Sequence, residues 1–534
     1  MTPAAQQTAH QTVQRRAHLR PPRPPQLAGV SAAALRSDLE RSGWTVEGVE
    51  QLLGPVAEAA LRRDSHVPAL RAARAAGDGD PVGVLTRLFL LAQPVPRAAL
   101  AAALPATGSD GAVAAGLVEA AGAAPDDAVR ALVDLRPHAA VDALGEVAWW
   151  VASDLGEHAL GDGQPLPPEH VLGIGGASAS LARLAVRTPA QRVLDVGTGS
   201  GVQALHATRH ARSVVATDTS ARALGFAAFN AAVAGVELDL RRGSLLEPVA
   251  GERFDQVVSN PPFVVTPRAA GVPGWEYRDG GLVGDEVVRQ LVTGLGGVLA
   301  PGGSAQLLGN WEHRAGEGWR DRVQGWLDES GLDGWVVQRE VMDPAHYAET
   351  WIRDGGQRPG PEADALLEAW LDDFAARGVE AVGLGFVVLH APPAESSART
   401  RWTRVEEVTG PLERPLGEHV AAVLAARDRL AVTDDDALLA ARLRVADDVT
   451  EERHARPGEG GPRAVLLRAG GGLGRVASVG TALAGLVGAC DGELEVGQVV
   501  GALAVLLEVD AGALRAELLP QVRGLVEDGL LEWT

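Results

Sequence analysis

Lysine is absent from this chain of 534 residues, so the 48 residues of the Lys and Arg class are all arginines. Acidic residues number 69, and the formal net charge is −21. Phosphate contacts need a basic surface, so this acid excess disfavours a sequence-independent nucleic-acid binder. A local basic stripe on an acidic protein stays compatible with the composition.

Cysteine occurs once, at Cys490, which rules out an intramolecular disulfide. Its surroundings, TALAGLVGAC, predict a buried and inert thiol. Apolar runs stay shorter than the roughly 18 residues of a membrane-spanning helix. The first residues also lack the apolar core of a signal peptide. We therefore expect a cytoplasmic protein without a membrane partner.

The length predicts several domains. Residues 1–28 contain RPPRPP and are typical of a disordered or extended arm. Residues 29–164 are predicted to form a helical, winged-helix-like domain. Its helical spacing includes Val84–Leu91 and Ala128–Leu135, and Val147–Ser153 is expected to be a strand. Residues 393–534 are predicted to form a small helical C-terminal domain.

Between these parts, residues 165–392 alternate short apolar strands with helices, which predicts a parallel α/β sheet. The expected strands are Arg192–Val196, Ser213–Thr217, Glu237–Arg241, Asp255–Ser259, Ser304–Gly309, Trp335–Val341 and Val382–His390. We predict a seven-stranded, Rossmann-like core that ends in an antiparallel hairpin.

The first motif of this core is RVLDVGTGSG, in which an apolar strand leads to Asp195. Gly197, Gly199 and Gly201 follow at alternate positions, with Thr198 between the first two. Glycine is needed where the backbone turns sharply and approaches a ligand. The motif predicts a nucleotide-like ligand at the carboxyl end of the strand, and it differs from the dinucleotide-binding pattern because the third glycine comes one position earlier.

The second motif, SVVATD, is a strand that ends in Asp218, followed by Thr219. A carboxylate at this place accepts hydrogen bonds from both ribose hydroxyls in dinucleotide-binding folds. The first two motifs alone therefore leave a nicotinamide oxidoreductase open.

The third motif is Asn260-Pro261-Pro262-Phe263, directly after the fourth expected strand. A planar amide or amino nitrogen is a poor nucleophile because its lone pair is delocalised. The Asn260 side-chain oxygen and the Pro261 carbonyl can accept both of its N–H protons, while Pro262 helps to fix the backbone and Phe263 stacks on the planar group. This motif has no role in hydride transfer, and it favours methyl transfer to nitrogen.

Together the three motifs resemble the class I methyltransferases that carry an Asn-Pro-Pro-Phe or Asn-Pro-Pro-Tyr sequence, and HemK-like enzymes in particular. The resemblance implies S-adenosylmethionine as the cofactor. It implies that Asp195 and the loop 197–201 hold the methionine part, that Asp218 and Thr219 contact the ribose, and that Ser244 and Leu245 lie over the adenine. It also implies that Asn260 belongs to both the cofactor site and the acceptor site.

Two methyl acceptors and one non-catalytic role stay open. The resemblance implies a protein glutamine of the release-factor type as the preferred acceptor, and the net charge agrees with a protein partner. The alternative is a nucleobase of rRNA or tRNA, at guanine N2 or adenine N6, supported by the N-terminal arginines and by Arg399–Arg404, RTRWTR. A catalytically silent binding module is the third possibility.

Several segments have a structural interpretation as well as a functional one. His206 and His210 have a spacing able to hold a metal, but a packed helix face is favoured, so no metal is expected. His170–Leu181 departs from the family motif that covers the cofactor, although Gly175, Gly176 and Ser178 can serve that role. Gly280–Asp285 faces the substrate or caps a helix, and RTRWTR equally fits an interdomain contact.

Overall fold

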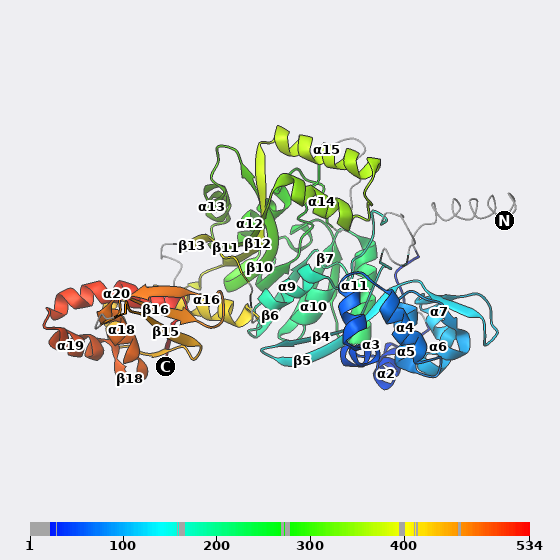
Figure 1. Cartoon of the computed structure of the whole chain (residues 1–534), viewed down its shortest axis with the longest axis horizontal. Helices are drawn as coiled ribbons and strands as arrows, with labels where there is room; N and C mark the ends of the chain where they lie inside the picture. The colour runs from blue at the N-terminus through cyan, green and yellow to red at the C-terminus, as the bar shows by residue number, and fades with distance from the viewer. Residues whose placement is uncertain are drawn as a thin grey trace.

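The computed structural model describes residues 22–27, 29–156, 159, 166–268, 272, 278–394, 401–410, 412, 415–457 and 461–534. The N-terminal helices lie at one end of the molecule, the large sheet in the middle and the C-terminal part at the other end (Figure 1). Most of the expected N-terminal arm, residues 1–21, lies outside the described residues. The arm residues Pro22–Leu27 have no regular structure, and the Gln26 N–H donates to the Ala115 carbonyl at 2.9 Å.

The N-terminal part is built mainly of helices, with one small three-stranded sheet. Its helices are α2 (Ala32–Arg41), α3 (Val46–Leu61), α4 (Val67–Ala75), α5 (Pro81–Leu85), the π-helical turn η1 (Thr86–Leu90), α6 (Arg97–Ala103) and α7 (Gly108–Ala114). The strands β1 (Val95–Pro96), β2 (Val118–Ala120) and β3 (Ala128–Ala131) form a sheet in the order β1-β3-β2. Helices α6 and α7 stand between the first and second strands, as in a helix-turn-helix with a wing.

The expectation of a helix over Ala128–Leu135 is wrong, because this segment forms β3 and the start of β4. Val129, Val133 and Leu135 are buried. The four-residue interval from Val129 to Val133 fits both the turn of a helix and the two-residue alternation of a strand. Pairing of β3 with both β1 and β2 decides between the two periods.

A long hairpin joins the N-terminal part to the core. It consists of β4 (Asp134–Asp142) and β5 (Gly145–Ser153), which contains the expected strand Val147–Ser153. The buried Asn230 side chain of α11 (Ala221–Ala234) bonds both the N–H and the carbonyl of Ala152, at 2.8 and 2.9 Å. One side chain thereby replaces a strand partner and fixes the hairpin on the core.

The central sheet has eight strands in the order β13-β11-β12-β10-β9-β6-β7-β8. They are β6 (Ala190–Val196), β7 (Ala211–Asp218), β8 (Asp239–Arg242), β9 (Phe254–Ser259), β10 (Leu299–Arg314), β11 (Asp333–Met342), β12 (Val379–His390) and β13 (Thr403–Glu407). All seven expected strands are present, and β12 is antiparallel to β10 and β11, which confirms the predicted final hairpin. The strand order reverses between β6 and β9, where α/β proteins bind ligands at the carboxyl ends of the strands.

Helices cover both faces of this sheet (Figure 1). Besides α11 they are α9 (Gly176–Leu184), α10 (Val202–Ala207), α12 (Glu286–Gly294), α13 (Trp319–Ser330), α14 (Pro344–Asp354) and α15 (Pro361–Ala376), with 3₁₀ turns η2 (Glu247–Val249) and η3 (Leu295–Gly297). Helices α14 and α15 are inserted between β11 and β12. Their apolar cluster contains Tyr347, Trp370 and Phe374 and reaches Val264 and Val265, just after the Asn-Pro-Pro-Phe sequence.

The C-terminal part contains the expected helices and, in addition, two three-stranded sheets, β18-β14-β19 and β15-β16-β17. The helices are α16 (Gly417–Ala431), α17 (Asp435–Leu439), α18 (Thr481–Gly488), α19 (Val496–Leu507) and α20 (Ala511–Glu527). The strands are β14 (Arg442–Val445), β15 (Val449–His454), β16 (Ala464–Ala469), β17 (Val476–Val479), β18 (Asp491–Glu495) and β19 (Leu531–Trp533). Cys490 is a buried free thiol in this core, and burial raises its pKa to about 11, as the sequence predicted for an inert cysteine.

Candidate functional site

The glycine loop follows β6 and leads into α10. Gly197, Gly199 and Gly201 have positive φ angles of 71°, 55° and 88°, a region that side-chain-bearing residues rarely adopt. A Cβ at Gly201 would lie only 3.1 Å from the Ala227 Cβ of α11. A Cβ at Gly199 would meet no atom within 4 Å. Gly201 is therefore fixed by packing, whereas Gly199 faces open space.

Asp195 holds the start of this loop. Its side chain is buried, and one carboxylate oxygen accepts hydrogen bonds from the Thr198 hydroxyl at 2.6 Å and from the Ala204 N–H at 3.0 Å. The other oxygen, Oδ1, is buried without a hydrogen-bond partner. Burial raises the pKa of Asp195 to about 7. The free oxygen is suited to a cationic ligand group, which would favour the ionised carboxylate.

Asp218 brings the second motif to the first. One of its oxygens accepts the Gly199 N–H at 2.9 Å, and the other accepts the Ser220 N–H at 2.8 Å. Burial raises its pKa, and these backbone hydrogen bonds oppose the rise. Thr219 follows directly, and its carbonyl accepts the Arg242 Nε–H at 2.9 Å. The predicted ribose residue therefore lies beside the glycine loop.

The Ser244–Leu245 turn lies next to the same strand. The Gly243 N–H donates to the Asp218 carbonyl at 3.0 Å. Leu245 has a φ of 47° and is half-buried on the apolar cluster of the sheet, while Ser244 is exposed. An apolar contact from Leu245, rather than a polar one from Ser244, fits the predicted role over an adenine.

The Asn-Pro-Pro-Phe sequence begins where β9 ends. Ser259 anchors this end, because its hydroxyl donates to the Val196 carbonyl at 2.8 Å. The Asn260 carbonyl lies 4.0 Å from the Cβ position of Gly197, so this loop and the glycine loop are neighbours. Asn260 Oδ1 is buried and has no hydrogen-bond partner. An unpartnered buried oxygen at this place is suited to a donor supplied by a ligand.

Phe263 is held from the α14 side. Its ring lies edge-on to Trp351 at 6.3 Å, and its backbone bridges to Asp279. The next residue donates its N–H to the Arg278 carbonyl at 2.8 Å. Trp351 was not among the residues predicted for the site, because nothing in its local sequence pattern marks it.

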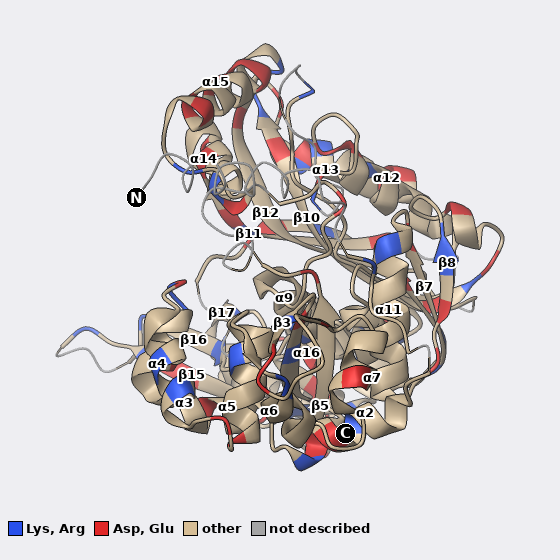
Figure 2. Cartoon of the chain, turned by 90° about the vertical axis from the view of Figure 1, so that its right-hand side faces the viewer, with Lys and Arg blue, Asp and Glu red and all other residues tan. Residues whose placement is uncertain are grey.

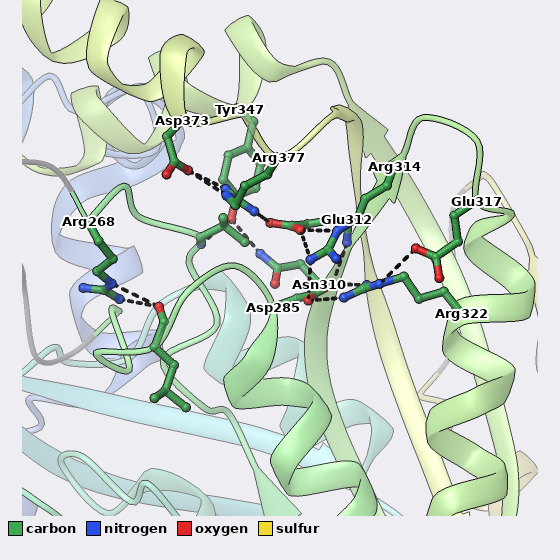
Figure 3. A network of polar contacts seen from close by, with 12 residues as sticks. Arg268, Asp285, Asn310, Glu312, Arg314, Glu317, Arg322, Tyr347, Asp373 and Arg377 are labelled. Atoms are coloured by element: carbon green, nitrogen blue, oxygen red, sulfur yellow. Dashed lines mark hydrogen bonds and ion pairs between the residues drawn. The ribbon is translucent and has the colours of Figure 1, made fainter. Parts of the chain in front are cut away.

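A network of buried charges lies behind this loop (Figure 3). Glu312 is fully buried and pairs with Arg314 and Arg377. Asp285 pairs with Arg322 and accepts the Glu312 N–H at 2.8 Å. Asp285 therefore holds β10 and α13 together. One interpretation of Gly280–Asp285 was that it caps a helix, but the Asp285 side chain makes no capping hydrogen bond to α12.

The other candidate segments have structural roles. His206 is buried, its Nε2 lies 3.2 Å from His138 Nε2, and burial lowers its pKa to about 3. His210 Nε2 lies 2.7 Å from the Gln256 amide oxygen. Among the residues that the structure describes, no group of three or more His, Cys, Asp or Glu side chains is placed to hold a metal.

The described part of RTRWTR, Arg401–Arg404, forms an interdomain contact. The Arg427 guanidinium of α16 lies 3.4 Å from the centre of the Trp402 ring, which also meets Trp335 of β11 at 6.1 Å. Arg404 pairs with Asp528 at 2.7 Å. Arg399 and Thr400 lie outside the described residues. Trp402 is thereby partly buried against the protein's own side chains.

The segment upstream of β6 reaches the glycine-loop helix. Gly175 precedes α9, and the Ser178 carbonyl accepts the Gln203 amide of α10 at 2.7 Å.

A separate cavity of about 1040 Å³ lies between the β4–β5 hairpin, α9 and the C-terminal part. The glycine loop, Asp218 and Asn260 do not line it. None of the described helices is long and apolar enough to cross a membrane.

The sheet order and the three adjoining motifs define a Rossmann-like fold of the class I methyltransferase type. Residues 174–272 match the model of the methyltransferase small domain family, in agreement with the resemblance found in the sequence. Residues 41–132 and 421–533 match two families described as domains of unknown function, DUF7059 and DUF7782.

Curated relatives match part of the chain. The release factor glutamine methyltransferase of Xylella fastidiosa is 36% identical over 141 residues, 23% of this chain and 49% of that protein. The ribosomal protein uL3 glutamine methyltransferase of Bradyrhizobium diazoefficiens is 34% identical over 169 residues, 29% of this chain and 53% of that protein. The chain thus spans about half the length of these relatives.

A ribosomal protein L11 methylase from Lactobacillus delbrueckii subsp. bulgaricus is a solved structure with some likeness. It has a TM-score of 0.24 and 21% identity, with 41% of this chain and 82% of that chain covered. The fold class follows from the strand order of the sheet.

Proposed function

We propose that this chain is an S-adenosylmethionine-dependent N-methyltransferase whose acceptor is the side-chain amide of a protein glutamine. The observation that carries the proposal is the buried, unpartnered Asn260 Oδ1 beside the glycine loop. The names of the glutamine methyltransferases in Xylella fastidiosa and Bradyrhizobium diazoefficiens support the acceptor class.

The residues present fit the cofactor. S-adenosylmethionine supplies an electrophilic methyl group on a sulfonium when it is bound. Asp195 offers its free carboxylate oxygen to the methionine ammonium group, and Asp218 offers its carboxylate to the ribose hydroxyls. The open space at the Gly199 Cβ position gives the ligand close access to the backbone. Leu245 provides an apolar contact for the adenine, while Thr198 and Thr219 complete the two loops.

The acceptor nitrogen is activated by position and by hydrogen bonding. Asn260 Oδ1 and the Pro261 carbonyl accept the two N–H groups, which localises the nitrogen lone pair toward the methyl group. Phe263 lies against the planar acceptor, and Trp351 limits how far its ring can turn. Methyl transfer would form the N–C bond as the C–S bond breaks, and the acceptor nitrogen would release one proton to solvent.

A protein acceptor fits the flanking winged helix better than a nucleic acid does. In winged-helix proteins that bind DNA, the second helix of the motif and the wing contact the duplex, and phosphate contacts need arginine or lysine. Here α7 and residues up to Asp127, positions 108–127, contain no basic residue, and Asp110 is exposed. Among the core helices, α12 contains one acidic and one basic residue, Glu286 and Arg289, whereas the charged residues of α15 are all acidic (Figure 2).

The test uses the purified full chain with tritium-labelled S-adenosylmethionine. The probes are the protein and the RNA fractions of a source strain that lacks the gene. We expect label that survives RNase and is lost on protease treatment. Label that RNase removes would overturn the protein acceptor in favour of a nucleobase. Calorimetry with S-adenosylhomocysteine and with NAD checks the cofactor, and binding of NAD alone would overturn the methyltransferase proposal.

A further inference from the structure

A second buried amide oxygen lies at the same edge of the sheet as Asn260. Asn310 belongs to the carboxyl-terminal half of β10 and is fully buried. Its Nδ2 donates a hydrogen bond to the Tyr347 hydroxyl of α14 at 2.6 Å. Its Oδ1 is buried and has no hydrogen-bond partner. Buried polar atoms without partners are rare in folded proteins, because losing water costs free energy that a hydrogen bond must offset.

The strand register places Asn310 on the face of the sheet that also carries Gln256 and Gln306. Strands β9 and β10 are parallel, with Ser259 opposite Leu307. Two positions of that face, Gln256 and Gln306, touch through their side-chain amides at 2.7 Å. Side chains alternate along a strand, so Asn310 is on the face of Gln306 and lies beyond the level at which β9 ends. Asn310 thus lies at the carboxyl edge of the sheet, where Asn260 follows the last residue of β9.

Tyr347 connects Asn310 to the acceptor loop. Its hydroxyl oxygen accepts the Val265 N–H at 3.0 Å as well as the Asn310 Nδ2–H. Val265 is two residues past Phe263, and Trp351, one helical turn after Tyr347, meets the Phe263 ring. Figure 3 shows Asn310 and Tyr347 side by side below α14. Helix α14 therefore forms a wall of the acceptor side and holds the Asn310 amide in one orientation.

From these contacts we infer that Asn310 is a further acceptor-binding residue, whose Oδ1 accepts an N–H of the residue to be methylated. The inference rests on the proposed function and specifies its site. A glutamine within a protein carries three N–H groups, two on the side chain and one on the backbone. Asn260 and Pro261 take the first two, so a third carbonyl oxygen has a donor left to bind.

The structure supplies a matched control on the same strand. Gln306 is also fully buried on β10, but its amide is partnered by Gln256, by the Ser304 hydroxyl at 2.9 Å and by the Val186 N–H at 3.4 Å. Gln306 is part of the fold and lies away from the acceptor edge. Removing the Gln306 amide is expected to lower stability because it breaks these hydrogen bonds. Removing the Asn310 amide breaks only the hydrogen bond from Nδ2, because Oδ1 has no partner in the folded protein.

The experiment compares Asn310→Ala, Tyr347→Phe and Gln306→Ala in the full chain. The readouts are initial rates of tritium transfer to the protein fraction of the deletion strain, the Kd of S-adenosylhomocysteine and the denaturation midpoint. Asn310→Ala is expected to lower kcat/KM for the protein acceptor by about tenfold or more, with the cofactor Kd within about twofold. Tyr347→Phe keeps Oδ1 and should lose clearly less.

Gln306→Ala is expected to lower the denaturation midpoint and to retain transfer at a temperature where it is folded. Equal losses of transfer in Asn310→Ala and Tyr347→Phe would overturn the inference, because Asn310 would then act only through Tyr347. Unchanged transfer in Asn310→Ala would overturn it as well. Both results leave the proposed function intact. Absence of protein labelling by the unaltered chain would instead be a failure of the proposed function.

Discussion

The Asp218 carboxylate accepts a hydrogen bond from the Gly199 N–H at 2.9 Å. This contact joins the end of β7 to the loop after β6, so one carboxylate orients the glycine loop and lines the site that we assign to the ribose. A ligand that bonds Asp218 therefore acts on a loop whose middle glycine faces open space.

Replacing Gly199 or Gly201 by alanine should separate ligand binding from folding. Both positions have positive φ, so both variants carry backbone strain of roughly 1 kcal/mol. Only Gly201→Ala also places a Cβ 3.1 Å from Ala227. We expect Gly201→Ala to lower the urea midpoint more than Gly199→Ala. Gly199→Ala should fold and weaken S-adenosylhomocysteine binding by about tenfold or more, measured by calorimetry. Tight binding by Gly199→Ala would contradict the assignment of this space to the ligand.

The raised pKa of Asp195 leads us to expect that the cofactor affinity depends on pH. The pKa of Asp195 is raised from its ordinary value of 3.8 to about 7 in the folded chain. The folded state is therefore progressively destabilised as the pH rises from about 4 to about 7, because the buried carboxyl group must ionise. A cationic ligand group favours the ionised form. Affinity for S-adenosylhomocysteine should therefore rise from pH 6 to pH 8, with proton release seen as a buffer-dependent binding enthalpy. The same pH slope in Asp195→Asn would refute this origin.

Asn260→Ala should abolish most turnover without loss of cofactor binding. The variant removes an oxygen that has no partner within the described protein, so the fold loses little. Loss of one preorganised hydrogen-bonding group typically lowers kcat by about 10²-fold or more. Transfer to the protein fraction and the Kd of S-adenosylhomocysteine are the two measurements. Turnover within twofold of the unaltered chain would contradict the proposed role and favour a silent binding module.

Arg427 is expected to matter for stability rather than for RNA. The nearly buried guanidinium lies over Trp402 and pairs with Glu527, so Arg427→Ala removes an interdomain contact and leaves a charge unpaired. We expect its thermal midpoint to fall by several degrees, as for a loss of about 1–2 kcal/mol. Arg320→Ala, an exposed arginine over Trp319, is the control and should change it little. Weaker RNA retention on a filter at an unchanged midpoint would support the nucleic-acid interpretation of RTRWTR.

The sequence by itself determined where the strands lie along the chain and where the three motifs follow them. Glycines at 197, 199 and 201 adopt the left-handed backbone that their spacing implied, and apolar runs such as Phe254–Ser259 form buried strands. These features are local, because φ preference and side-chain period act over a few residues. The period failed at Ala128–Leu135, where a spacing of four fits a helix and a strand equally.

Tertiary structure alone decided which groups meet the acceptor loop and which are left without partners. Val265 and Tyr347 are 82 residues apart, and Asn310 reaches the same hydroxyl from a third element. No local pattern marks Asn310, Tyr347 or Trp351, because their roles come from the folding of α14 over the end of the sheet. Whether a buried oxygen finds a donor depends on every neighbour at once. The unpartnered oxygens of Asn260 and Asn310 could therefore be recognised only in the folded chain.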